Sequence, residues 1–218
     1  MRDAYHEELD AITEALVDLG NLVGSAMGRA TTALLDADLQ LAEGVIAGDA
    51  VIDDRYHEIE ERAFELLARQ QPVATDLRIL VTSLRMVADI ERAGDLALHV
   101  AKVARRRYPH SAIPVGLRST ILEMGQVAER IMTKAGDVIA SRDVDLARQL
   151  ENDDDAMDDL HRTLFTVILR DDWSGGVEAA IDVTLVGRYY ERFADHAVSV
   201  ARRVVYLVTG EMEMRSSV

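Results

Sequence analysis

The chain has 218 residues, of which 49% are hydrophobic and only 5% aromatic, with a formal net charge of −15 and no cysteine. A net negative surface repels phosphate groups, which excludes non-specific nucleic-acid binding, and the lack of cysteine excludes disulfides and thiolate metal sites. Any metal site must use carboxylate oxygens with an occasional histidine, ligands that suit harder ions. The few aromatics and the abundant Ala, Leu, Glu and Arg favour helices over sheets.

The N-terminus does not resemble a signal peptide, because Asp3, Glu7 and Glu8 stand where such a peptide needs basic and then apolar residues. No uninterrupted apolar run approaches the roughly 20 residues of a membrane-spanning helix. We therefore expect a cytoplasmic protein without membrane insertion.

Apolar residues recur in alternating steps of three and four from Leu9 to Ala33. This heptad pattern predicts one long first helix that packs in the manner of a coiled coil. Gly20, Gly24 and Gly28 follow one another at a spacing of four on the same segment. In a bundle this spacing indicates a close approach of a neighbouring helix.

A second helix is predicted at about 38–71, with Asp38 as its N-cap. Proline disfavours helical geometry in the residue before it, so Pro72 closes this helix. Thr75 is then predicted to cap a third helix at about 75–107. The basic and proline-containing stretch that follows is interpreted as a linker.

The rest of the chain repeats the first part. Apolar positions of the first helix recur 105 residues later, as Ile12, Leu16, Leu19, Val23, Ala26, Ala30 and Ala33 followed by Leu117, Ile121, Met124, Ala128, Ile131, Ala135 and Val138. The third helices match at an offset of 100, and we expect a shorter loop around Trp173 to account for the difference. The sequence thus predicts an all-α fold of two tandem three-helix bundles of long antiparallel helices, with domains 1–110 and 111–218.

The pattern Glu-Arg-x-x-Asp-x-Ala occurs twice, starting at Glu91 and at Glu191. Two carboxylates four residues apart lie on one face of a helix. The second helix of each unit carries a further acid pair. Together the pairs are Asp49 with Asp53, Glu91 with Asp95, Asp154 with Asp158, and Glu191 with Asp195. Because the Pro72 turn lies 19 residues from both Asp53 and Glu91, the two pairs of the first unit should meet at one height.

Four carboxylates at one level repel one another unless a cation neutralises them. We therefore predict that all eight residues bind metal. In a chain with 39 acidic residues, a single pair is more often a solvated surface, and Arg92 and Arg192 would also serve as salt-bridge partners. The recurrence of the pairs at matched positions favours the metal interpretation.

The histidines and the remaining motifs indicate no chemistry of their own. His57, His99 and His161 have no duplicated counterpart and are interpreted as surface histidines with satisfied hydrogen bonds. His99 also follows Asp95 by one helical turn, a position from which it could join the first site. The chain has no Gly-rich phosphate loop and no nucleophile with an adjacent base. We predict no catalytic residues and no enzymatic activity.

The chain resembles the PhoU family of phosphate-transport accessory and regulatory proteins. The resemblance rests on Arg69-Gln70-Gln71-Pro72-Val73-Ala74-Thr75-Asp76-Leu77-Arg78 and on the two segments around Glu91 and Glu191, Ile90-Glu91-Arg92-Ala93-Gly94-Asp95-Leu96-Ala97 and Tyr190-Glu191-Arg192-Phe193-Ala194-Asp195-His196-Ala197. It covers nearly the whole chain, including the duplication and the four acid pairs.

The resemblance implies two three-helix bundles related by a pseudo-twofold axis, with metal clusters on the acid pairs, of iron, zinc, manganese or magnesium. It also implies a negative regulator of phosphate uptake and of the phosphate-starvation response. Its expected partners are the ATPase subunit of the phosphate importer and a phosphate-sensing histidine kinase, which would hold it at the inner face of the membrane. We also expect a homodimer.

Two alternatives remain open, a carboxylate-bridged iron oxidase or store, and a purely structural helical scaffold. The second unit also departs from the family pattern, because Phe193 and Ala194 stand where a small residue and glycine are usual. We expect the bulk of Phe193 to tighten or displace the second site. If only one unit retains a full cluster, it should be the first.

Overall fold

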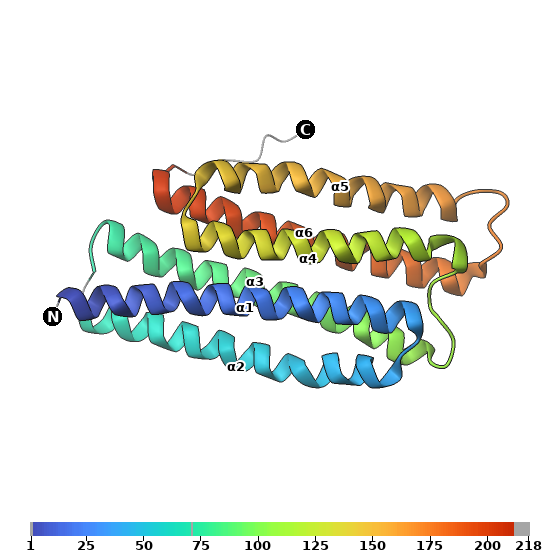
Figure 1. Ribbon diagram of the computed structural model, residues 1–218, viewed down its shortest axis with the longest axis horizontal. Helices are drawn as coiled ribbons and strands as arrows, with labels where there is room; N and C mark the ends of the chain where they lie inside the picture. Colours follow the sequence, from blue (N-terminus) through green and yellow to red (C-terminus); the bar gives the residue numbers. More distant parts are fainter. Residues whose placement is uncertain (1, 71, 212–218) are drawn as a thin grey trace.

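The computed structural model describes residues 2–70 and 72–211, which form six α-helices and a short 3-10 turn (Figure 1). The helices are α1 (Arg2–Asp36), α2 (Leu39–Gln70), α3 (Thr75–Arg107), α4 (Arg118–Ser141), α5 (Val144–Ile168) and α6 (Gly176–Thr209), and the 3-10 turn is η1 (Val115–Leu117). The all-α prediction is confirmed. The predicted domains 1–110 and 111–218 include residues 1, 71 and 212–218, which lie outside the described part, and their limits stay a prediction.

Equivalent helices of the two repeats pack against each other. Helix α1 contacts α4, and α3 contacts α6, so these four helices form the centre of the molecule, while α2 and α5 lie on opposite outer sides (Figure 1). Buried apolar residues from all six helices join in one hydrophobic core. Each repeat therefore buries its apolar face against the other, as expected for two three-helix units related by a pseudo-twofold axis.

Helix starts follow the duplication in α2 and α5. Asp38 Oδ1 accepts a hydrogen bond of 2.9 Å from the backbone N–H of Leu41, and Asp143 Oδ1 accepts bonds of 2.9 and 3.0 Å from the backbone N–H groups of Asp145 and Leu146. Both are N-caps, which confirms the prediction for Asp38.

The predicted cap of α3 is wrong. The N-cap of α3 is Ala74, with φ 48° and without a side-chain cap, and Thr75 is already the first helical residue. The chain reaches α3 through a residue in left-handed geometry, so the Thr75 side chain is one position too late to cap the helix. Gln71, at which α2 was expected to end, lies outside the described residues.

The glycines of α1 line its contact with α4, as their spacing predicts. A Cβ on Gly24 would lie 3.8 Å from the backbone oxygen of Glu129, and one on Gly28 only 3.0 Å from the Glu129 carboxylate. From the other side, a Cβ on Gly125 would lie 2.6 Å from the Thr31 side chain. Small residues on both helices therefore permit a close crossing of the two repeats.

The five-residue change of offset has a different cause from the one expected. Helix α5 has 25 residues, whereas its counterpart α2 has 32. The segment between α5 and α6 covers 169–175 and is longer than the 71–74 segment between α2 and α3. The second repeat is thus shorter because α5 ends about two turns before the position equivalent to the end of α2. Its loop is not shorter.

Polar contacts also connect the repeats. Asp182 on α6 is 1% exposed, and its carboxylate accepts hydrogen bonds from Arg106, at 2.7 Å, and from Arg107 at the end of α3. The Tyr190 hydroxyl, on the same helix, lies 2.7 Å from the Thr31 hydroxyl of α1. These contacts fix the position of α6 on the first repeat. None of the helices in the described ranges combines the length and the hydrophobicity that crossing a bilayer requires.

Candidate functional site

The two acid pairs of the first repeat meet between α2 and α3. Asp49 and Asp53 lie on α2, Glu91 and Asp95 on α3, and all but the exposed Asp53 are half-buried. Asp49 is within electrostatic range of both Asp53 and Asp95, and Glu91 is within range of the other three. We call these four residues the first cluster. The equal distance of the pairs from the Pro72 turn thus places them at one height.

Burial and mutual repulsion perturb the first cluster. Burial is the main cause that raises the pKa of Asp49, and the charges of Asp53 and Asp95 raise it further. Lys102 and His99 on α3 act in the opposite direction and lower that pKa. The first cluster is therefore partly neutralised by side chains of the protein itself.

The pKa of Glu91 is raised by the same two causes as that of Asp49. Burial and then the charge of Asp95 raise its pKa, whereas Arg92 lowers it. The Arg92 guanidinium lies 3.7 Å from the Glu91 carboxylate and 3.5 Å from that of Asp95. Arg92 is therefore the salt-bridge partner that the motif suggests, although its exposed side chain contributes little to stability.

The second repeat reproduces this arrangement as a second cluster of Asp154, Asp158, Glu191 and Asp195. Asp158 is exposed and the other three are half-buried, which repeats the burial of their counterparts. Burial, followed by the charges of Asp158, Asp195 and Glu191, raises the pKa of Asp154 to about 7. Asp154 thus has the largest pKa shift among the carboxylates of the two clusters.

The cations around the two clusters differ. The counterpart of Lys102 is Arg202, which forms a salt bridge with Glu151. The counterpart of His99 is Ser199, which carries no charge. The Nη1 group of Arg188 donates to both carboxylate oxygens of Glu191. Burial is the largest cause of the raised pKa of Asp154, and its negative neighbours add to it, whereas Lys102 and His99 oppose the same causes at Asp49.

Phe193 does not enter the second cluster, contrary to our expectation. Its side chain is 0% exposed and belongs to the hydrophobic core, as does that of its counterpart Ala93. Two residues after Glu191, the helix has turned by about 200°, so Phe193 points away from the face that carries Glu191 and Asp195. The larger side chain changes the packing of the core and leaves the carboxylate face in place.

Comparison with known proteins identifies the family. The PhoU domain matches the chain twice, at residues 16–104 and 121–204, once in each repeat. The chain belongs to the PhoU family. Phosphate-specific transport system accessory protein PhoU homolog 2 of Mycobacterium tuberculosis is 54% identical over 210 residues, covering 96% of this chain and 99% of that protein.

Solved PhoU structures have the same fold. PhoU from Pseudomonas aeruginosa matches with a TM-score of 0.86 and 31% identity, over 95% of this chain and 100% of the solved chain. The phosphate transport system regulatory protein PhoU from Streptococcus pneumoniae also has a TM-score of 0.86, at 23% identity, over 96% and 99% of the two chains. The duplicated three-helix architecture is thus the PhoU fold.

His161 is not a satisfied surface histidine in this PhoU chain, so that interpretation is wrong. Its Nε2 atom is buried and has no hydrogen-bond partner among the residues described, and burial and the charge of Arg188 lower its pKa. A Cβ on Gly187 would lie 3.1 Å from the His161 ring. The sequence carried a sign of this contact, because the first repeat has Tyr56 and Val87 at the equivalent positions. His57 and His99, by contrast, are exposed.

The residue types of the two clusters suit a cation, but the positions of their side chains do not yet form a metal site. Carboxylate oxygens are the ligands that hard cations prefer, and each cluster contains repulsion that a cation would relieve. Within residues 2–70 and 72–211, however, no three Asp, Glu or His side chains are grouped so that they could hold a metal ion as they lie. Metal binding at the eight residues would require side-chain rotation, and it stays a prediction.

Asp154→Asn should make the metal-free protein more stable at high pH. The folded-state pKa of Asp154 is about 7, above its ordinary value of 3.8, so the folded chain binds more protons than the unfolded chain between these values. This carboxylate therefore costs stability that grows as pH rises through that window. With allowance for solvent screening, we expect a gain of about 1–2 kcal/mol at pH 8 and little change at pH 4.

Urea unfolding at the two pH values, with a chelator present, measures this effect. Asp171→Asn is the control, because Asp171 is exposed and is not among the charges that raise the pKa of Asp154. An equal effect of Asp154→Asn at both pH values would rule out the buried, repelled state of Asp154.

Proposed function

We propose that this PhoU chain is a cytoplasmic, non-enzymatic negative regulator of phosphate uptake and of the phosphate-starvation response. It acts by contact with the ATPase subunit of the phosphate importer and with a phosphate-sensing histidine kinase. The observation that carries the proposal is the 54% identity, over nearly the full length of both chains, to a phosphate-specific transport system accessory protein. The same architecture in a phosphate transport system regulatory protein is compatible with it.

We further propose that the carboxylate clusters bind iron, zinc, manganese or magnesium. Each cluster combines carboxylates from an outer and a central helix, α2 with α3 and α5 with α6. A cation shared by both helices would fix how the outer helix lies on the central one and would reduce the negative charge of the exposed surface. The clusters thus offer a way to make partner contact depend on a bound cation.

A pull-down with the purified importer ATPase and the cytoplasmic part of the kinase tests the regulatory proposal. We expect the wild-type chain to retain both proteins, and more of them at high phosphate than at low phosphate. Asp171→Ala, a change of an exposed acid outside both clusters, should leave retention unchanged. Retention of neither partner at either phosphate concentration would refute the proposal, and oxygen-dependent turnover of iron would favour the oxidase alternative.

The proposed homodimer is tested separately. Light scattering on the purified chain should give twice the 24.1 kDa mass of the monomer. A mass that stays at the monomer value over the concentration range would contradict this part of the proposal.

A further inference from the structure

The row of carboxylates on α5 continues into a histidine. Asp154, Asp158 and His161 follow one another at spacings of four and three, so their side chains lie on one face of the helix. This face points to α6, because the charges of Asp195 and Glu191 on that helix add to burial in raising the pKa of Asp154. His161 thus lies one helical turn beyond the second cluster, on the face that carries its two aspartates.

Helix α6 leaves room for this histidine. Gly187 lies four residues before Glu191, on the same face of α6. Since α5 and α6 run antiparallel (Figure 1), the turn of α5 that carries His161 lies opposite the turn of α6 that carries Gly187. A Cβ on Gly187 would lie 3.1 Å from the Cδ2 atom of His161 and 3.6 Å from its Nε2 atom. The imidazole therefore lies on the backbone of α6, one turn from Glu191.

The His161 ring has an unused nitrogen. Its Nε2 atom is buried and has no hydrogen-bond partner within residues 2–70 and 72–211. Burial and the charge of Arg188 lower the pKa of His161, so the ring is neutral near neutral pH, the form in which an imidazole binds a metal ion. The ring packs edge-on against Phe165, with the ring centroids 5.0 Å apart. Packing thus fixes the ring while leaving a buried polar atom unsatisfied, which disfavours the metal-free state.

A positive side chain already contacts this end of the second cluster. The Nη1 group of Arg188 donates to both carboxylate oxygens of Glu191, and after burial its charge is the next cause that lowers the pKa of His161. One guanidinium is therefore close to both groups. The Arg188 side chain is 55% exposed, so it can turn into solvent at little cost when another cation takes its place.

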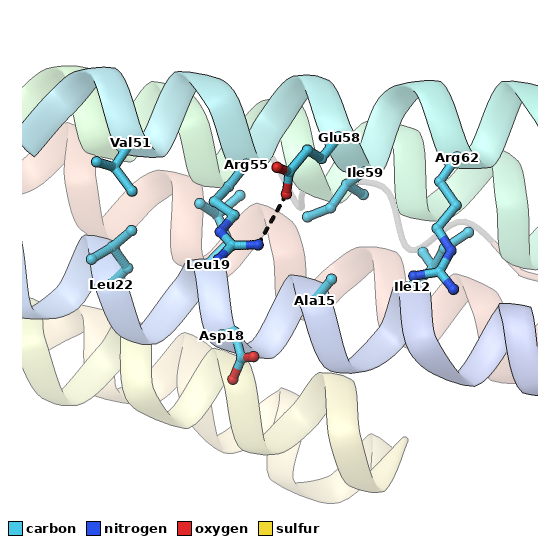
Figure 2. Close-up of a pocket in the computed structure, with 10 residues that line it drawn as sticks. All are labelled: Ile12, Ala15, Asp18, Leu19, Leu22, Val51, Arg55, Glu58, Ile59 and Arg62. Atoms are coloured by element: carbon cyan, nitrogen blue, oxygen red, sulfur yellow. Dashed lines mark hydrogen bonds and ion pairs between the residues drawn. The ribbon is translucent and has the colours of Figure 1, made fainter.

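The first repeat has a different side chain at the equivalent position. Figure 2 shows Arg55 at the groove between α1 and α2, where it donates to Glu58 at 2.9 Å. Tyr56, the counterpart of His161, is turned by about 100° from it, and its hydroxyl donates to Glu60 at 2.9 Å. The polar atom of the first repeat is therefore satisfied within α2, whereas that of His161 is not.

His196 does not take this place at the second cluster. It follows Asp195 directly and is turned by about 100° from it around α6. Its Nδ1 atom lies 3.3 Å from the Asp89 carboxylate, which belongs to α3. The nitrogen that lies where α5 meets α6 is that of His161.

One imidazole changes which ions a carboxylate cluster suits. Magnesium prefers oxygen ligands and keeps several of its waters, whereas zinc readily combines histidine nitrogen with carboxylate oxygen. A nitrogen ligand therefore raises the affinity for zinc more than that for magnesium.

We propose that His161 is a metal ligand of the second cluster, beside its carboxylates, and that it makes this cluster prefer zinc to magnesium. The inference rests on the proposed metal binding of the clusters. It adds a ligand that the first repeat lacks at the equivalent position, and with it a difference in metal preference. Like the carboxylates, the imidazole reaches a shared ion by side-chain rotation.

Zinc and magnesium binding to the second cluster alone tests the inference. Glu91→Ala/Asp95→Ala disables the first cluster and serves as the background. Competition with a chromophoric chelator measures the zinc affinity, and equilibrium dialysis measures the magnesium affinity. His161→Gln should weaken zinc binding at least about tenfold and change magnesium binding by less than about twofold. His110→Gln, the same change at an exposed histidine outside both clusters, should alter neither.

Nuclear magnetic resonance of the background protein with isotope-labelled histidine gives a second measurement, which does not depend on the folding of His161→Gln. Addition of zinc should shift a ring nitrogen of one histidine. The shifted resonance should persist in His110→Gln and in His196→Gln and should be lost in His161→Gln. Circular dichroism should show that the three variants keep their helices.

Zinc binding that leaves every histidine resonance in place would overturn the inference. So would an equal loss of zinc and magnesium affinity in His161→Gln, because a merely structural role would weaken both. Either result leaves the proposed metal binding intact. If wild type and background protein both bind no metal, the proposed metal binding itself fails, and the inference fails with it.

Discussion

Phe193→Ala is expected to lower the free energy of unfolding by about 3–5 kcal/mol. The Phe193 side chain is 0% exposed at the centre of α6, which contacts α3, α4 and α5. Its removal leaves a cavity in the core that the two repeats share, and the helices around it cannot close without shifting. Urea unfolding followed by circular dichroism measures the loss.

The control for this prediction is the adjacent residue in the motif. Arg192 is exposed, so Arg192→Ala should change stability by less than about 0.5 kcal/mol. If Phe193→Ala were as mild as Arg192→Ala, Phe193 would not lie in the core. In that case its side chain would be available to affect the second cluster, as the sequence alone suggested.

Asp182→Ala is expected to cost about 3 kcal/mol. The Asp182 carboxylate is buried and receives hydrogen bonds from Arg106 and Arg107 across the contact of α3 with α6. Its removal leaves the Arg107 guanidinium, which is 20% exposed, without its main partner. The cost lies at the lower end of the range for a broken buried pair, because the 57% exposed Arg106 can turn to water.

Glu178→Ala separates burial from charge in this network. Glu178 also pairs with Arg107, but its side chain is 80% exposed, so we expect a loss of less than about 1 kcal/mol. Thermal unfolding of the two variants beside wild type makes the comparison. Equal losses would show that the number of charges, and not the buried position of Asp182, determines the contribution to stability.

Much of the fold could be predicted because the same pattern of apolar residues occurs twice in the sequence. The heptad pattern of residues 9–33 predicted the long first helix, and the recurrence of this pattern 105 residues later predicted the second unit. Asp38 and Asp143 occupy matched positions and both cap a helix. A duplicated pattern supplies an internal check that single propensities lack, since a chance match seldom keeps one offset over two helices.

Details that depend on three-dimensional packing could not be predicted in the same way. Thr75 has the preferred chemistry of an N-cap, but the left-handed Ala74 places the helix start one residue earlier. The Nε2 atom of His161 is buried, and its ring lies beside Gly187, whose small size matters only once α5 lies on α6. Arg55 is exposed on α2, whereas its counterpart Leu160 on α5 packs against the core, a difference that depends on how each outer helix lies on its repeat.

In the carboxylate clusters, too, one part was predictable from the sequence and another was not. Asp53 and Glu91 lie at the same distance in sequence from the Pro72 turn, and this was enough to predict that their acid pairs meet. The neighbouring cations were not predictable, because Lys102 acts on Asp49 across two helices while its counterpart Arg202 is held by Glu151. The pKa of Asp154 is raised by burial and by its negative neighbours, whereas Lys102 and His99 oppose the same causes at Asp49.

The metal content of the protein purified without chelator tests the central claim most directly, that both clusters bind a cation. Elemental analysis should find metal in the wild-type chain, a reduced amount in Glu91→Ala/Asp95→Ala and in Glu191→Ala/Asp195→Ala, and none above background when all four changes are combined. Addition of a chelator should lower the melting temperature of wild type but not of the fourfold variant. Identical metal content and stability in wild type and the fourfold variant would contradict the claim.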